Sequence, residues 1–212
     1  IVIPSTVKHI GYGTFSSCTN IESIVIPNTV ETIESYVFSY CSKLASVTLP
    51  DNLEYIGYDL FNSCTSLKEI TVDEGVTSIP KYAFRNMTSL ETINLPESLT
   101  TISAYAFDGC TALKSIELPE ALSSIENYAF RGCSGIKEIT VPEKVTVINY
   151  GVFGNCTGLA EVKLPKTLTT IHPYAFENCL FEEIDIPDSV TKLASNAFIN
   201  CTKLSTVGYP AE

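Results

Sequence analysis

The chain has 212 residues, of which 45% are apolar, so it is long enough to bury a substantial core, yet no apolar run approaches the roughly 18 residues of a membrane span. Thirteen basic against 24 acidic residues give a net charge of −11, which argues against nucleic acid as a partner, because phosphate binding depends on Lys and Arg. No signal peptide and no Gly/Ser-rich or Pro-rich linker is visible, so we expect one elongated domain over residues 1–212.

A 23-residue pattern recurs from one end of the chain to the other. Its phenylalanine column shows seven intervals of 23 residues and a last interval of 22, at Phe15, Phe38, Phe61, Phe84, Phe107, Phe130, Phe153, Phe176 and Phe198. Three residues after each Phe lies a Cys or, once, Met, at Cys18, Cys41, Cys64, Met87, Cys110, Cys133, Cys156, Cys179 and Cys201. A proline column runs beside them from Pro4 to Pro210. A fixed period of this length predicts stacked turns whose apolar columns form continuous ladders.

The first element of each repeat is the segment L-x-x-I-x-L, as in residues 113–118, which ends at a proline such as Pro119. Its inward and outward positions alternate, so it predicts a short strand. Stacked turns would pair these strands in parallel at a spacing of about 4.8 Å. Proline is compatible with this arrangement because it stands where the ladder stops.

The second element of each repeat surrounds the phenylalanine. The residue before the Cys column is Asn or Gly in six of nine repeats, namely Asn86, Gly109, Gly132, Asn155, Asn178 and Asn200. These residue types accept positive φ, so the pattern predicts one helical or 3₁₀ turn closed by a left-handed cap. Several tyrosines flank the phenylalanine column, among them Tyr82, Tyr105 and Tyr128, and we expect them on the same turn side.

This pattern resembles the leucine-rich repeats of the 23-residue BspA-like class of bacterial and protozoan surface proteins. The match is close in residues 113–133 and covers the whole chain. The resemblance implies a leucine-rich repeat solenoid, a right-handed arc of nine stacked turns with a parallel β-sheet on the concave side and short helical or 3₁₀ turns on the other side. It also implies an extracellular or cell-surface location, and it implies no catalytic activity.

The eight cysteines occupy a single column, which raises the possibility of disulfides or a metal site. Met87 divides them into groups of three and five, so pairing neighbours would leave one unpaired thiol in each group. Because Met replaces Cys once, we interpret the column as a ladder of small buried hydrophobic side chains with free thiols. No C-x₂₋₄-C pair occurs and the two histidines lie in different columns, so we expect no metal or other cofactor.

Catalytic patterns are absent from the sequence. His9 and His172 lie about seven turns apart and cannot share a site, and the acidic residues recur with the repeat instead of forming an isolated pair. The sequence also contains no nucleophile elbow, phosphate loop or dinucleotide fingerprint. We therefore expect no catalytic residues and a protein that is not an enzyme.

Outward strand positions offer the candidate ligand-binding residues. They form two columns of mostly small, hydroxylic or acidic side chains on the expected concave face, at Ser46, Thr48, Glu69, Thr71, Thr92, Asn94, Ser115, Glu117, Glu138, Thr140, Glu161, Lys163, Glu183 and Asp185. A third column, which we call the acidic ridge, follows the strands at Asp51, Glu74, Glu97, Glu120 and Glu143.

Two interpretations of the acidic columns stay open at the level of sequence. Like charges about 5 Å apart repel by roughly 0.8 kcal/mol per pair even in water, so the side chains can fan apart and simply keep the solenoid soluble. Alternatively, the ridge and the outward glutamates attract a basic protein patch or divalent cations.

The sequence as a whole indicates a non-enzymatic cell-surface binding or adhesion module, with a protein or extracellular-matrix component as its ligand. The alternatives are a structural spacer that holds another domain away from the surface and a targeting arm of a secreted enzyme. Both ends of the chain are cut in phase with the repeat, so we also expect a fragment of a longer protein whose isolated copies could stack end to end.

Overall fold

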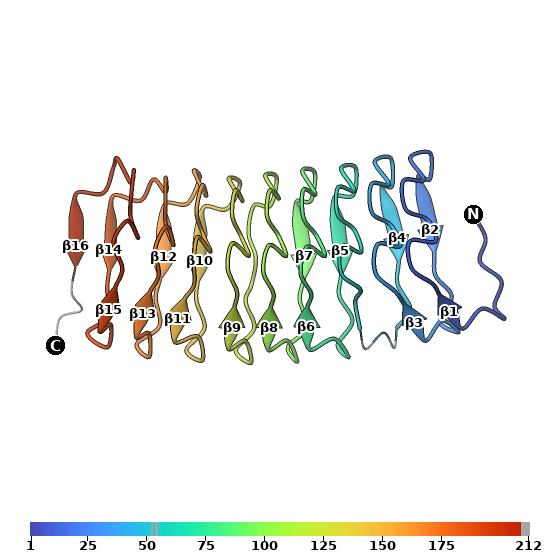
Figure 1. The fold of residues 1–212 in the computed structure, drawn as a ribbon, viewed down its shortest axis with the longest axis horizontal. Helices are drawn as coiled ribbons and strands as arrows, with labels where there is room; N and C mark the ends of the chain where they lie inside the picture. The colour runs from blue at the N-terminus through green and yellow to red at the C-terminus, as the bar shows by residue number, and fades with distance from the viewer. Residues whose placement is uncertain (52, 54, 209–212) are drawn as a thin grey trace.

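The computed structural model describes residues 1–51, 53 and 55–208, and it is a parallel β-solenoid of about nine turns. The turns stack side by side along one long axis, with the first and last described turns at opposite ends (Figure 1). Parallel pairs such as His9 with Thr32 and Glu138 with Glu161 are 23 residues apart, so the sequence period is the length of one turn. The solenoid predicted from the repeat is thereby confirmed. Pro210, at the end of the proline column, lies outside the described residues.

The predicted strands form the first of two ladders. Within the described residues they are three residues long, at β2 (Ser23–Val25), β4 (Ser46–Thr48), β5 (Glu69–Thr71), β7 (Thr92–Asn94), β10 (Glu138–Thr140), β12 (Glu161–Lys163), β14 (Glu183–Asp185) and β16 (Thr206–Gly208). In most of them the middle residue is buried and both neighbours are exposed, as the alternation of side chains along a strand requires. We call the surface that carries these strands the strand face.

The strand-face ladder is interrupted. Among the described residues its strands pair two by two, as β2 with β4, β5 with β7, β10 with β12, and β14 with β16, and a single bridge joins Val2 to Val25 of β2. The corresponding segment of the fifth turn, residues 115–117, lies between β7 and β10 and is not a strand. A continuous sheet was expected from the sequence, and these interruptions are the main departure from it.

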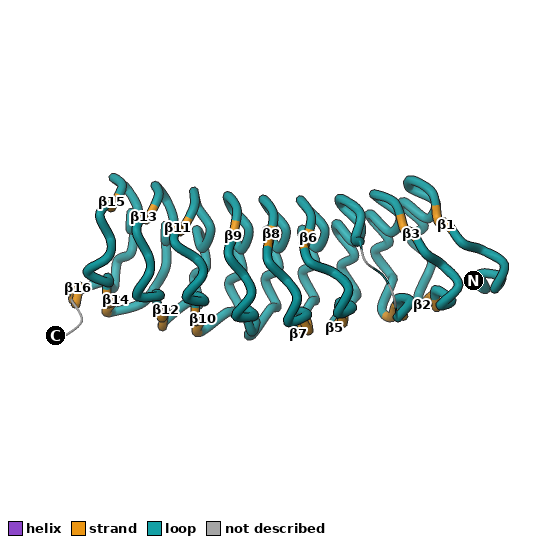
Figure 2. The backbone as a smooth tube through the Cα atoms, turned by 90° about the horizontal axis from the view of Figure 1, so that it is seen from below, coloured by secondary structure: helices purple, strands orange, loops and turns teal. Residues whose placement is uncertain are grey.

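A second ladder, which the sequence analysis did not predict, lies along another edge of the solenoid (Figure 2). Its strands in the described chain have two residues each, at β1 (His9–Ile10), β3 (Thr32–Ile33), β6 (Ser78–Ile79), β8 (Thr101–Ile102), β9 (Ser124–Ile125), β11 (Val147–Ile148), β13 (Thr170–Ile171) and β15 (Lys192–Leu193). The second residue of nearly every pair is buried, and it belongs to the apolar column that precedes the A-F motif.

The prediction of helical or 3₁₀ turns beside the phenylalanines was wrong: the described residues contain no helix, and this side consists of tight turns. Hydrogen bonding explains why. The amides of Tyr105, Phe107 and Gly109 donate to carbonyls of the following turn, at 3.1, 2.8 and 2.8 Å. The amides between them donate within their own turn, for example Asp108 N–H to the Tyr105 carbonyl at 3.2 Å. A helix directs all of these amides along its own axis, and would therefore leave no bonds between turns.

The core is a stack of the predicted columns. Successive phenylalanine rings lie with centroids 5.2–6.0 Å apart and planes within 16° of parallel, and the rings from Phe38 to Phe176 are fully buried. In the shortened repeat, Phe181 packs edge-on against Phe176 and Phe198 at 5.8 and 6.2 Å. Leucine is usual at this position, and the larger phenylalanine ring of Phe181 fills the space that the missing residue opens beside the stack.

The cysteine column has a bonding role beyond its size. All eight thiols are free, six of them are buried, and seven donate to the carbonyl of the phenylalanine one turn earlier, at Sγ–O distances of 3.0–3.2 Å. The buried thiol ladder expected from the sequence is confirmed. The preference for Cys over another small apolar residue follows from this thiol donor, which Met87 lacks.

Candidate binding site on the strand face

The structure places every predicted ligand-binding residue on the exposed surface of the strand face, on the outward positions that flank the inward middle residues. All five residues of the acidic ridge are exposed as well. The side chains predicted from alternation are therefore accessible, and the interruptions in the ladder decide which of them lie around a depression.

Three grooves open on the strand face where neighbouring turns are not paired. The first, of about 350 Å³, lies between β7 and residues 115–118 and is bordered by Glu97, Glu117 and Glu120. The second, of about 360 Å³, lies between residues 115–118 and β10 and adds Glu138 and Lys163. Together these two make one acidic depression around the unpaired fifth turn, which we call the central groove.

The third groove is more balanced in charge. It measures about 430 Å³, lies between β12 and β14, and brings Glu161, Glu183 and Asp185 together with Lys163 and Lys166. Of the predicted columns, Ser46, Thr48, Glu69 and Thr71 line none of these three grooves.

The segment that the two halves of the central groove share has main chain without partners in the neighbouring turns. Within the described residues, the backbone of residues 115–118 makes no hydrogen bond to either neighbouring turn, whereas the amides of Glu91 and Thr92 both donate to the Lys68 carbonyl, at 2.8 and 3.2 Å. Backbone amides and carbonyls that lack protein partners must be satisfied by solvent or by a ligand. The central groove therefore combines four carboxylates with free main-chain donors and acceptors.

The acidic ridge has a partly structural role. Glu74 accepts a hydrogen bond from the Glu97 amide at 3.2 Å, and Glu143 accepts one from the Lys166 amide at 3.5 Å. Asp51 accepts a 2.6 Å bond from the Asn28 side chain of the preceding turn. Only Glu97 and Glu120 of the ridge reach a groove, so the ridge does not act as a single surface.

A polar cluster around His9 lies outside these three grooves. His9 contacts the Thr32 hydroxyl and lies 3.2 Å from Glu34, but both the imidazole and this carboxylate are about half exposed, so the cluster is a polar contact between turns in open solvent. Among the described residues, no group of three His, Cys, Asp or Glu side chains could hold a metal ion. The described part of the chain likewise has no helix with the length and apolarity that crossing a membrane requires.

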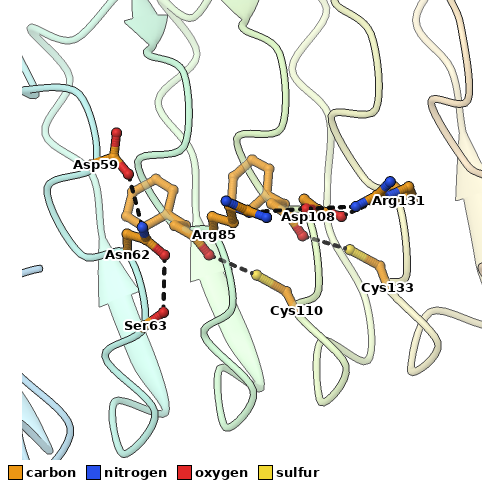
Figure 3. Close-up of polar contacts among 10 residues, drawn as sticks. Asp59, Asn62, Ser63, Arg85, Asp108, Cys110, Arg131 and Cys133 are labelled. Carbon is orange, nitrogen blue, oxygen red and sulfur yellow. Dashed lines mark hydrogen bonds and ion pairs between the residues drawn. The ribbon is translucent and has the colours of Figure 1, made fainter. Parts of the chain in front are cut away.

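Sequence reasoning missed one cluster, on the turn side. Arg85 and Arg131, the only arginines of the chain, lie two turns apart and both bind Asp108 of the intervening turn (Figure 3). The sequence does contain a charge pattern that indicates this cluster: in three successive repeats, the residue after the phenylalanine is Arg, Asp and Arg. The period alone does not show that these three side chains point toward one another, which depends on how the turns stack.

Comparison with known proteins defines the class of this solenoid. The pattern of the BspA type leucine rich repeat region, in six copies, matches residues 1–103 and 77–205. The chain belongs to this family of leucine-rich repeat proteins, as the sequence pattern predicted. No protein with a curated description matches it.

Solved structures of leucine-rich repeat proteins share the fold. One from Eubacterium ventriosum is 27% identical with a TM-score of 0.59, over 93% of this chain and 63% of that one. One from Bacteroides ovatus is 28% identical with a TM-score of 0.53, over 98% and 72%. A leucine-rich repeat protein of T. pallidum is 25% identical with a TM-score of 0.52, over 94% and 72%.

Proposed function

We propose that this chain is a non-enzymatic binding module, displayed at a cell surface, that holds an extended basic segment of a partner protein in the central groove. The observation that carries the proposal is the unpaired main chain of residues 115–118 between two acidic walls. An extended peptide uses such amides and carbonyls for main-chain bonding, as strands do when they add to a sheet. Its lysines or arginines would face Glu97, Glu117, Glu120 and Glu138.

The surface location rests on the family resemblance, which implies bacterial or protozoan surface proteins. Association over a shallow groove is expected to be electrostatically steered and therefore sensitive to salt. The spacer alternative predicts no binding at the groove, and the targeting-arm alternative predicts the same binding beside a catalytic domain. Binding therefore separates the module from the spacer.

The test uses a fluorescent decalysine peptide and the whole chain, with affinity measured by anisotropy at several salt concentrations. In the groove variant, Glu97→Lys, Glu117→Lys and Glu120→Lys reverse three charges in the depression. In the control variant, Glu31→Lys, Glu34→Lys and Glu126→Lys make the same change in net charge at exposed positions beside the two-residue strands.

We expect the groove variant to bind at least about tenfold more weakly, and the control variant to lose less than about threefold. Equal losses would show that the peptide responds only to the net charge of −11, and would exclude the groove as its site. Absence of binding by the unmodified chain would favour the spacer.

A further inference from the structure

A ladder of tyrosines with both arginines beside it occupies the turn side, away from the strand face. The rings of Tyr82, Tyr105 and Tyr128 follow one another with centroids 5.3 and 5.0 Å apart, the first pair tilted by 32° and the second stacked. The guanidinium of Arg85 lies 5.2 Å from the Tyr82 ring, and that of Arg131 lies 5.6 and 5.4 Å from the rings of Tyr105 and Tyr128. We call these five residues the tyrosine–arginine platform.

The platform is held rigid by Asp108. Its carboxylate, whose side chain is only 6% exposed, accepts bonds from Arg85 Nε at 3.1 Å and from Arg131 Nε and Nη2 at 2.8 and 3.2 Å (Figure 3). Cation–π contact with the rings fixes the same guanidinium groups from a second direction. The two arginines are thus preorganised about two turns apart, roughly 10 Å at the spacing of parallel strands.

The platform keeps hydrogen-bond donors for a ligand. In the described structure, neither terminal nitrogen of Arg85 and none of the hydroxyls of Tyr82, Tyr105 and Tyr128 has a hydrogen-bonded protein partner. No buried side-chain nitrogen or oxygen of the described residues lacks a partner, so these unbonded atoms must reach solvent. The two arginine side chains are 37% and 40% exposed, which agrees with this conclusion.

The charge of the platform is opposite to that of the chain. One carboxylate, Asp108, faces two guanidinium groups, and Lys81 adds a third cation 4.7 Å from the Tyr82 ring. Two further carboxylates lie near these cations: Asp59, one turn before Tyr82, interacts electrostatically with Arg85 and Lys81, and Glu177 interacts with Tyr128. Asp59 and Asp108 offset two of the three cations, so a local excess of one positive charge remains among these groups, in a protein of net charge −11.

We infer that the tyrosine–arginine platform binds an acidic polysaccharide that carries carboxylate groups. Guanidinium forks suit carboxylates, and the row of phenol hydroxyls suits sugar hydroxyls. The spacing favours a sugar chain over a peptide: one ring per turn at 5.0–5.3 Å is close to the length that one pyranose adds to an extended chain, whereas an extended peptide advances only about 3.3–3.6 Å per residue. This site is independent of the central groove and would give the module a second ligand.

The test measures binding of hexagalacturonate to the whole chain by calorimetry, with maltohexaose as the neutral sugar and a phosphoserine peptide of equal charge as the alternative partner. In one variant, Arg85→Lys and Arg131→Lys keep the charge and the pairing with Asp108 but remove the planar fork. In a second, Tyr82→Phe, Tyr105→Phe and Tyr128→Phe keep the ring stack and remove the hydroxyls. The matched control is Tyr12→Phe with Tyr36→Phe, a tilted ring pair with centroids 5.1 Å apart and no arginine over either ring.

We expect hexagalacturonate to bind and maltohexaose to bind at least about tenfold more weakly, with affinity for hexagalacturonate falling about fivefold or more in the lysine variant. The phenylalanine variant should lose about threefold or more and the control less than twofold. Any of four results would overturn the inference. They are unchanged affinity in the lysine variant, equal binding of the neutral sugar, tighter binding of the phosphopeptide, and no binding of hexagalacturonate. Binding of decalysine should be the same in all variants, so failure here is distinct from failure of the proposed function.

Discussion

The thiol of Cys133 donates a hydrogen bond to the carbonyl oxygen of Phe107, one turn earlier, across 3.1 Å. The same carbonyl accepts the amide of Cys110 in its own turn at 3.1 Å. Most phenylalanine carbonyls in the middle of the solenoid bond in this way, both within their own turn and to the next one. Phe61 and Phe84 are exceptions, because Met87 offers no thiol to the Phe61 carbonyl and its amide makes no hydrogen bond to the Phe84 carbonyl within the described residues.

Because of this bond, we expect thiol removal to lower the free energy of unfolding by different amounts along the cysteine column. Cys133→Ala deletes a donor and leaves a small cavity in a fully buried position, so it should lower the free energy of unfolding by about 1–3 kcal/mol. Cys18→Ala should cost less, because Cys18 is partly exposed and its thiol has no bonded carbonyl among the described residues. Urea denaturation measures both. Cys133→Ser, which keeps a donor, should fall between alanine and the original residue; a serine variant less stable than the alanine variant would contradict a contribution from donation.

Thiol alkylation should follow burial along the same column. Burial raises the pKa of the Cys156 thiol to about 12, and it also raises the pKa values of Cys64, Cys133 and Cys179, so these groups are neutral at pH 8. Because the thiolate is the nucleophile, iodoacetamide should label Cys18 first and the buried cysteines only on unfolding. Peptide mass spectrometry of the native and the guanidinium-unfolded protein checks this order. Early labelling of Cys133 or Cys156 would contradict it.

The sequence predicted the solenoid and its core because the repeat makes every inward column recur in register. It also predicted positive φ at the Asn and Gly positions before the cysteines, and all six have φ between 55° and 78°. The same conformation at Ser17, Tyr40 and Ser63 was not predicted, since these residue types rarely adopt it. Stacking imposes it there, because the neighbouring turns fix where each amide must point.

A second positive-φ column was missed for the same reason. It contains five tyrosines, namely Tyr36, Tyr82, Tyr105, Tyr128 and Tyr174, with φ of 59° to 64°. Local propensity does not indicate a left-handed tyrosine, and only the bonds from these amides to the next turn account for it. The central groove was less predictable than the fold. The alternation of inward and outward residues located the exposed columns, but the unpaired segment 115–118 depends on the register between turns.

Positive φ at the turn before the cysteines predicts opposite effects of two substitutions. Ser63→Gly should raise the free energy of unfolding by about 1 kcal/mol, because Ser63 has a φ of 61° that glycine adopts without steric cost. Gly132→Ala should lower it by about 1 kcal/mol, because φ there is 73° and the added Cβ would meet nothing closer than 3.7 Å. Thermal and urea unfolding of both variants tests the pair. A stabilising alanine at position 132 would refute the assigned backbone conformation.

Replacement of the buried carboxyl of Asp59 should stabilise the protein in a pH-dependent manner. Asp59 is 6% exposed, and burial raises its pKa above the ordinary 3.8, against the opposing bonds from Asn62 and Tyr36. Over the interval between the ordinary and the raised pKa, the folded state binds more protons than the unfolded state, so the stability due to this group falls as pH rises. Asp59→Asn removes that titration, and asparagine fits the backbone because Asn196 has a φ of 63° in the same column.

The gain in stability of Asp59→Asn should therefore be small at pH 3, grow as pH rises through the raised pKa of Asp59, and then stay constant to pH 7. Urea denaturation at pH 3, 5 and 7 measures it. Asp108→Asn is the matched control, because it removes a carboxylate that two arginines compensate, and it should destabilise the protein at pH 7 by about 3 kcal/mol. An Asp59→Asn variant less stable than the original chain at pH 7 would mean that Arg85 and Lys81 compensate the Asp59 charge more than burial opposes it.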